Sequence, residues 1–119
     1  FENDLYRDFT YIDDIVEGIV RLIDHPPVED VPSAVFNIGN NNPEKLMVFI
    51  GTLEKCLSKS LNRDVIFDKV FEPIKPGDVP ATYASTDLLQ KAVGFKPKTS
   101  IEEGLQQFTD WYVDYYNVK

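Results

Sequence analysis

Sulfur and imidazole side chains are scarce in this 119-residue chain, which has one cysteine, Cys56, and one histidine, His25. A single cysteine excludes an internal disulfide, and a reducing compartment is the simplest interpretation. Structural zinc sites usually combine about four Cys and His ligands, so we expect no metal site. Cys56 falls on the apolar face of a predicted helix, which favours a buried core thiol over a nucleophile.

Positive charge is scarce too. The chain has 12 Lys and Arg against 20 Asp and Glu, a net charge of -8. Because nucleic-acid binding needs a basic surface, we expect no nucleic-acid partner, and any bound anion must be held by a local cluster of donors. No run approaches the ~18 apolar residues of a membrane span, and no signal peptide is recognisable. We therefore expect no membrane association and a cytoplasmic location.

The remaining composition is that of an ordinary globular protein, with 43% hydrophobic and 27% charged residues. This length supports one core, so we expect a single domain over residues 1–119. Hydrophobic periodicity, proline and glycine positions and capping residues predict the elements. In chain order the first elements are an extended segment at 5–10, a helix at 12–24, a strand at 35–38 and a helix from Asn42-Pro43-Glu44 to about Leu61. They are followed by a strand at 64–67, a Pro/Gly-rich loop at 72–83, and a helix that Ser85 caps and that runs through Val93 to a stop at Gly94. A last helix has a capping box at Thr99/Glu102 or Ser100/Glu103.

Helical spacing also predicts which faces are buried. The predicted buried positions are Ile12, Ile15, Val16, Ile19, Val20 and Ile23 in the first helix, Leu46, Phe49, Ile50, Leu53, Cys56 and Leu57 in the second, and Ile101, Leu105, Phe108, Tyr112 and Tyr115 in the last. The predicted fold class is α/β: a small, helix-rich unit with few short strands. Such a set is typical of a lobe docked on a larger sheet rather than a self-sufficient doubly wound fold.

Two segments carry residue types suited to a pyrophosphate and to a pair of vicinal hydroxyls. Arg7 offers five fixed donors that match a pyrophosphate. In Pro76-Gly77-Asp78, the glycine lets the backbone approach a ligand while the carboxylate accepts from two hydroxyls. Structural alternatives stand beside these interpretations. Arg7 has Asp4, Asp8 and Asp13 nearby as ion-pair partners, Asp78 suits a turn, and Lys75 suits a solvated loop.

Several motifs, taken in order, resemble one family. They are Arg7 to Asp14, Phe36-Asn37-Ile38-Gly39, Pro76 to Ala84, Gly94-Phe95-Lys96-Pro97 and Ile101-Glu102-Glu103-Gly104. Together they resemble the C-terminal substrate-binding lobe of extended short-chain dehydrogenase/reductase nucleotide-sugar epimerases, and most closely the capsule-type UDP-glucuronate 4-epimerases. The resemblance implies a fragment of a larger enzyme whose Rossmann domain is absent from this chain.

In that family a Rossmann half binds NAD and supplies a Tyr-x-x-x-Lys pair. The resemblance therefore implies no catalytic and no cofactor-binding residue here. Tyr115 and Lys119 have the same spacing, but they lie at the extreme C-terminus with no glycine-rich loop before them.

The resemblance implies substrate-binding roles instead. Arg7 and Lys75 contact the diphosphate, Asp78 accepts from the ribose hydroxyls, and Thr82 lies near the sugar. Related galactose-type enzymes commonly carry Arg where this chain has Lys75. A lysine is a point charge without the planar fork of arginine, which weakens the match at this position.

The expected function is the nucleotide-sugar-binding lobe of an NAD-dependent UDP-sugar 4-epimerase that converts UDP-glucuronate to UDP-galacturonate in capsular polysaccharide biosynthesis. Its expected partners are a UDP-sugar and its own N-terminal Rossmann domain, in an enzyme that forms a homodimer. The fragment alone is expected to be inactive and to expose apolar surface. Two alternatives remain open: the lobe of a nucleotide-sugar 4,6-dehydratase or reductase, and a stand-alone interaction module without catalysis.

Overall fold

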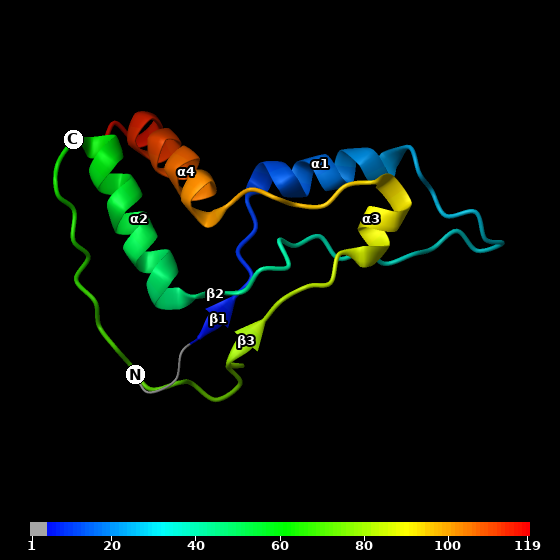
Figure 1. Cartoon of the computed structure of the whole chain (residues 1–119), viewed down its shortest axis with the longest axis horizontal. Coiled ribbons are helices and arrows are strands. Elements are labelled where there is room, and N and C mark those ends of the chain that lie inside the picture. The colour runs from blue at the N-terminus through cyan, green and yellow to red at the C-terminus, as the bar shows by residue number, and fades with distance from the viewer. Residues whose placement is uncertain (1–4) are drawn as a thin grey trace. The chain divides into compact units, whose positions relative to one another are not determined.

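The computed structural model describes residues 5–119, which form short strands and longer helices (Figure 1). The strands are β1 (Tyr6–Arg7), β2 (Glu44–Lys45) and β3 (Ala81–Thr82), and the helices are α1 (Ile12–Ile23), α2 (Leu46–Leu61), α3 (Asp87–Val93) and α4 (Ile101–Tyr116). The strands form one sheet in the order β2-β1-β3. This confirms the expected helix-rich α/β fold with few short strands.

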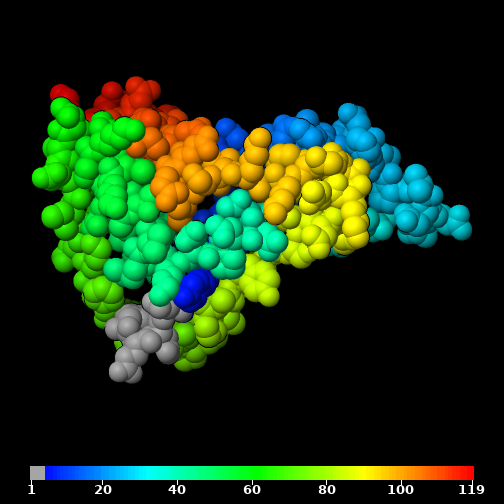
Figure 2. Space-filling view, viewed as in Figure 1, coloured from blue at the N-terminus to red at the C-terminus, as the bar shows by residue number. Residues whose placement is uncertain are grey.

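The chain divides into two compact units. The first comprises β1, β2 and residues 46–81 and 100–119, and the second comprises residues 8–43 and 82–99. In the first unit, α2 and α4 pack side by side (Figures 1 and 2). Cys56 and Leu105 are buried between them, and Thr109 is 1% exposed.

Helix α4 begins with the predicted cap. The Ser100 hydroxyl oxygen accepts a hydrogen bond from the Glu103 N–H at 3.1 Å, which selects the Ser100/Glu103 pair over Thr99/Glu102. A polar cluster fixes the register of α4 against α2. Asp110 Oδ1 accepts from the Ser60 hydroxyl at 2.6 Å and from Gln106 Nε2 at 2.9 Å.

The predicted strand at 64–67 is wrong, because side chains of α2 hold this segment. The Val65 N–H donates to Ser58 Oγ at 2.9 Å, and the Phe67 N–H donates to Glu54 Oε1 at 2.8 Å. The Lys69 ammonium also pairs with Glu54. The segment therefore runs extended along a helix, and these two backbone donors are used without a neighbouring strand.

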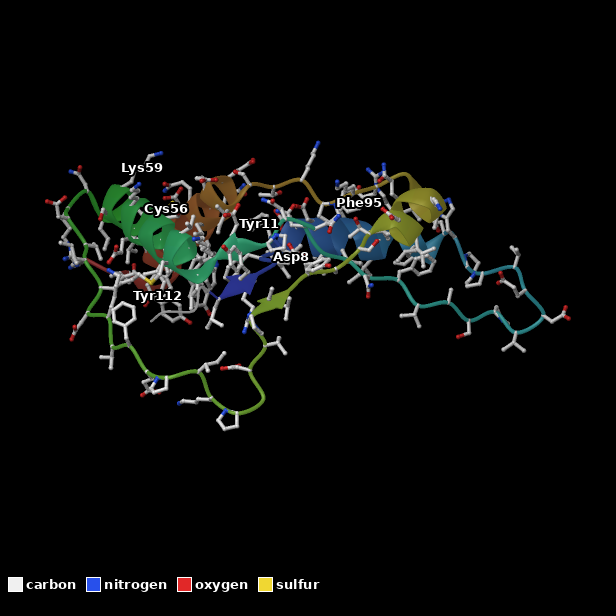
Figure 3. The ribbon with its side chains drawn as sticks, turned by 60° about the horizontal axis from the view of Figure 1, so that its bottom comes forward. Asp8, Tyr11, Cys56, Lys59, Phe95 and Tyr112 are labelled. Carbon is white, nitrogen blue, oxygen red and sulfur yellow. The ribbon has the colours of Figure 1, made fainter. Side chains whose placement is uncertain are left out.

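In the second unit α1 packs against α3, and Asp14 joins α1 to the segment that follows α3. Asp14 is 8% exposed, and its Oδ2 accepts from the N–H groups of Lys98 at 3.2 Å and Thr99 at 2.9 Å. Leu89 and Phe95 supply the apolar part of this core, and Phe95 is labelled in Figure 3. Helix α3 ends at Val93 with Gly94 in the left-handed region, as predicted from the sequence.

The predicted buried face of α1 is wrong. Ile12, Val16, Ile19, Val20 and Ile23 are between 49% and 71% exposed. The buried positions are Asp14 and Gly18, which share a face because they are four residues apart. This face differs from the one that carries the apolar residues. We call these five exposed residues the α1 stripe. Its exposure confirms the expectation that the chain presents apolar surface.

The predicted apolar face of α4 is only partly buried. Leu105 is 8% exposed, whereas Phe108, Tyr112 and Tyr115 are 44%, 37% and 65% exposed. Their rings, together with those of Trp111 and Tyr116, contact one another along the helix. These aromatic side chains therefore pack on one another along α4 while remaining partly exposed.

Two further predictions are corrected. Residues 35–38 form no strand: Val35 is 85% exposed, and the segment from 24 to 36 extends away from α1 and α3 (Figure 2). Helix α2 begins at Leu46 rather than at Asn42-Pro43-Glu44, because Glu44 and Lys45 pair antiparallel with β1. A pair of ladder residues cannot also form a first helical turn.

Candidate functional site

Arg7 lies at the end of β1, against the loop that carries the Pro-Gly-Asp motif. Its Nη1 donates to the main-chain oxygen of Val79 at 3.0 Å and to that of Tyr6 at 2.8 Å. The side chain is partly buried, and the guanidinium carries further N–H groups at Nε and Nη2. The structure thus brings Arg7 to the loop that contains Lys75 and Asp78.

The loop itself contains a defined turn from Lys75 to Asp78. The Asp78 N–H donates to the Lys75 carbonyl at 3.1 Å, and Gly77 has a φ of +95°. Proline at the second position and a positive-φ glycine at the third are the signature of a type II turn. Residues 71–80 are exposed, so the turn presents the Asp78 carboxylate toward solvent on a backbone with a fixed local shape.

Lys75 forms a surface ion pair with Glu72. Lys75 Nζ lies 2.9 Å from Glu72 Oε2, and the two side chains are 74% and 59% exposed. Exposed pairs of this kind contribute about 0–1 kcal/mol, because solvent screens the charges and both side chains lose freedom. The geometry matches the solvated-lysine alternative, and the weak pair leaves the ammonium accessible to a stronger anion.

The ion-pair alternative for Arg7 named three acids. Asp4 lies outside the described residues. Asp8 Oδ2 accepts from main-chain N–H groups of its own unit, at Asn41 (2.9 Å) and Ala84 (3.4 Å). Asp13 is exposed in the first turn of α1, where a carboxylate complements the helix dipole.

Thr82 belongs to the second unit, where it is exposed in β3. Its carbonyl oxygen accepts from the Asp8 N–H at 3.1 Å. Sequence reasoning named Asp8 only as an ion-pair candidate and missed its contacts. The turn at Gly39-Asn40-Asn41-Asn42 was the available signal, because such turns leave backbone N–H groups that need an acceptor.

Cys56 confirms the prediction of a buried thiol. It is 7% exposed, and Sγ contacts the Glu102 carbonyl oxygen at 3.8 Å. Burial raises the pKa of the Cys56 thiol, with a smaller opposing effect from Lys59. Figure 3 labels both residues on α2. Within residues 5–119, three or more His, Cys, Asp or Glu side chains nowhere gather in an arrangement able to hold a metal ion.

None of the helices in the described part of the chain has the length and apolar character needed to cross a membrane. His25, the single histidine, lies just beyond α1, and its Nδ1 is 2.9 Å from the Arg21 carbonyl oxygen. His25 therefore lies at the C-terminal end of α1, outside the helix.

Known proteins match nearly the whole chain. The family model described as GDP-mannose 4,6 dehydratase matches residues 2–108. Protein CapI of Staphylococcus aureus is 40% identical over 126 residues, a match that covers 94% of this chain and 36% of CapI. A probable UDP-glucuronate 4-epimerase of Rhizobium meliloti (strain 1021) is also 40% identical, with 97% of this chain and 36% of that protein covered.

A solved structure shares the fold as well. The UDP-glucuronic acid 4-epimerase from Bacillus cereus, in complex with UDP-glucuronic acid and NAD, matches with a TM-score of 0.74 and 28% identity. The match covers 97% of this chain and 34% of that one. This chain therefore spans about a third of the length of the proteins it resembles. It belongs to the GDP-mannose 4,6-dehydratase family, within the extended short-chain dehydrogenases/reductases.

Proposed function

We propose that this chain is the nucleotide-binding lobe of an NAD-dependent UDP-sugar 4-epimerase. The substrate and product that we favour are UDP-glucuronate and UDP-galacturonate. The observation that carries the proposal is the contact between the Arg7 guanidinium and the loop that holds the Pro-Gly-Asp turn. The name of the Rhizobium meliloti relative and the ligand of the Bacillus cereus enzyme support this choice of sugar.

Each proposed binding residue has chemistry suited to one part of a UDP-sugar. Arg7 offers a planar fork of donors for the diphosphate, and Lys75 adds a flexible point charge. Asp78, at the last position of the turn, accepts from vicinal ribose hydroxyls. Thr82 is exposed in β3, and we propose that it lies near the sugar. These groups hold the remote nucleotide, so that the sugar keeps the freedom it needs to turn over between oxidation and reduction.

The Gly39 turn does not fit the phosphates of NAD. The Gly39 turn has one glycine instead of a glycine-rich fingerprint, and a Cβ there would lie 3.0 Å from Asp8 Oδ2 and 3.1 Å from Ala84 Cβ. Protein atoms therefore fill the space beside the Gly39 backbone, and one of them is a carboxylate oxygen, which repels a phosphate. We propose that a Rossmann domain outside this chain holds NAD and the catalytic pair, and that this chain alone is inactive.

The α1 stripe supports the proposal that another part of the same polypeptide packs against this chain. Five adjacent aliphatic side chains at 49–71% exposure form a larger apolar surface than scattered exposed residues do. The relatives are about three times as long as this chain, so the remainder of such an enzyme is the natural cover for the stripe. We propose a homodimeric, cytoplasmic enzyme that acts in capsular polysaccharide synthesis, and the likeness to CapI supports the capsular role.

One observation favours a second function, a nucleotide-sugar 4,6-dehydratase, because the matching family model carries that description. Product analysis of the complete enzyme with NAD separates the two. We expect UDP-glucuronate to give UDP-galacturonate, detected by NMR through inversion at C4. A 4-keto-6-deoxy product from GDP-mannose or UDP-glucose, with no inversion of UDP-glucuronate, would establish the dehydratase instead.

A further inference from the structure

The Asp8 carboxylate joins three segments of the second unit. Oδ2 accepts from the N–H groups of Asn41 at 2.9 Å and Ala84 at 3.4 Å, and Oδ1 accepts from the N–H of Asn42 at 3.3 Å. The carboxylate thereby connects the segment after β1, the Asn-rich turn and the segment after β3. Figure 3 labels Asp8 among these segments.

Residue 8 also holds the segment after β3 through its backbone. The Asp8 N–H donates to the Thr82 carbonyl at 3.1 Å, while its side chain accepts from the N–H of Ala84. Two contacts from one residue therefore bracket Thr82 and Tyr83. The intervening torsion angles are restricted, although Thr82 and Tyr83 are themselves exposed.

The surroundings suit a carboxylate rather than an amide. Three N–H donors converge on its two oxygens, whereas an amide would offer one oxygen and one NH2 donor. Gly39 is buried against the same group, because a Cβ there would lie 3.0 Å from Oδ2. The neighbouring Asn40 N–H is held separately, by Thr10 Oγ1 at 3.2 Å.

We infer that Asp8 is a positioning residue: by bracketing Thr82 within the second unit, it orients the residue that we propose to lie near the sugar. This inference rests on the proposed function. The inference goes beyond that function by giving two neighbouring residues different roles. Arg7 contributes to UDP affinity, and Asp8 contributes to the orientation of the sugar. Displacements of about 1 Å near reacting atoms can cost roughly 100-fold in rate, so such bracketing has a kinetic consequence.

The test compares Asp8→Asn with Asp30→Asn in the complete enzyme. Asp30 is exposed in the extended segment of the same unit, so its variant matches the charge change. We expect Asp8→Asn to lower kcat for UDP-glucuronate about tenfold while the Kd for UDP changes less than about twofold, since one of three hydrogen bonds is lost. Asp30→Asn should change neither constant.

A second variant covers the case in which Asp8→Asn fails to fold. Gly39→Ala keeps the charge but pushes on Oδ2, and it should show the same loss of kcat with UDP affinity retained. A double-mutant cycle adds a readout that a general structural defect would not give. Asp8→Asn and Thr82→Ser should be non-additive in kcat, because both act on one position.

The possible outcomes distinguish failure of the positioning role of Asp8 from failure of the proposed function. Parallel losses of UDP affinity and turnover in Asp8→Asn, unchanged turnover, or strict additivity with Thr82→Ser would each overturn the positioning role and leave the epimerase proposal intact. A wild-type enzyme that inverts no UDP-sugar would overturn the proposed function, and the positioning role with it.

Discussion

At the scale of single residues, Arg7 combines a structural contact with the binding role proposed for it. The Arg7 guanidinium is held by two main-chain carbonyls, so one of its nitrogens serves the fold. Sequence alone gave the residue type and its neighbours. It could not give these contacts, because Val79 lies 72 residues away and long-range partners depend on how the chain folds.

Arg7→Lys should weaken UDP binding to the complete enzyme about tenfold, a change of ~1.4 kcal/mol, because lysine has no planar fork and cannot hold the loop and a phosphate together. Titration calorimetry with UDP measures this change. Arg63→Lys is the matched control, since Arg63 is exposed and its Nη2 donates to the main-chain oxygen of Lys119. Equal UDP affinity for wild type and Arg7→Lys would remove Arg7 from the site.

Cys56 should react slowly in the folded chain. Burial raises the pKa of its thiol, so little thiolate forms near pH 7.5, and the sulfur is covered. We expect labelling by an aromatic disulfide reagent to be at least about tenfold slower in native buffer than in urea. Cys56→Ser gives the zero-labelling baseline. Rapid, stoichiometric labelling of the native chain would contradict the buried position.

At the scale of elements, local signals predicted helix ends better than strands. The Ser100 cap and the Gly94 stop follow from one or two residues and were confirmed. The strands at 64–67 and 35–38 were wrong because β-propensity describes a suitable surface, and a strand also needs a partner that the sequence does not reveal. Segment 64–67 found the side chains of α2 instead.

The contacts of Lys69 and the Phe67 N–H with Glu54 make the stability of the fold depend on pH. The Lys69 ammonium, and secondarily the Phe67 N–H, lowers the pKa of Glu54 below its usual 4.5. The unfolded chain therefore binds more protons in that range. The stabilisation is present above about pH 4.5 and is lost as pH falls through the lower folded-state pKa.

Urea unfolding of wild type and Glu54→Gln between pH 7 and pH 3 tests this. The gap between their unfolding free energies should be widest near pH 7 and should narrow in acid. Glu29→Gln, at an exposed loop position, should leave the curve unchanged. A gap that stays constant across the range would show that the Glu54 charge contributes nothing.

At the scale of the whole molecule, the chain presents surface that suits burial against more protein. Helical periodicity found the α1 stripe correctly as an apolar face, but assigned it to an internal core. Periodicity reports that a face is apolar, not which protein atoms cover it. The chain spans about a third of its relatives' length, and the proposed function assigns the cover of the stripe to the remainder of such an enzyme.

The stripe predicts self-association of the 119-residue chain. Val20→Lys should shift sedimentation toward monomer at high concentration, because a charge in the stripe opposes its burial. Val28→Lys makes the same charge change at a 96% exposed position outside the stripe and should sediment like wild type. A wild-type chain that stays strictly monomeric across concentrations would contradict the prediction.

The loop before β3 is fastened at both ends: Lys69 pairs with Glu54 of α2, and the Pro80 carbonyl accepts from the Tyr6 N–H at 2.8 Å. The number of residues between these attachments thus acts as a spacer that sets how far the Lys75–Asp78 turn reaches. Deleting one residue from 70–74 shortens that reach by up to ~3.5 Å, more than a hydrogen bond tolerates. If the turn binds the nucleotide as proposed, a change in loop length would therefore alter the size of ligand that fits, with every contacting side chain left unchanged.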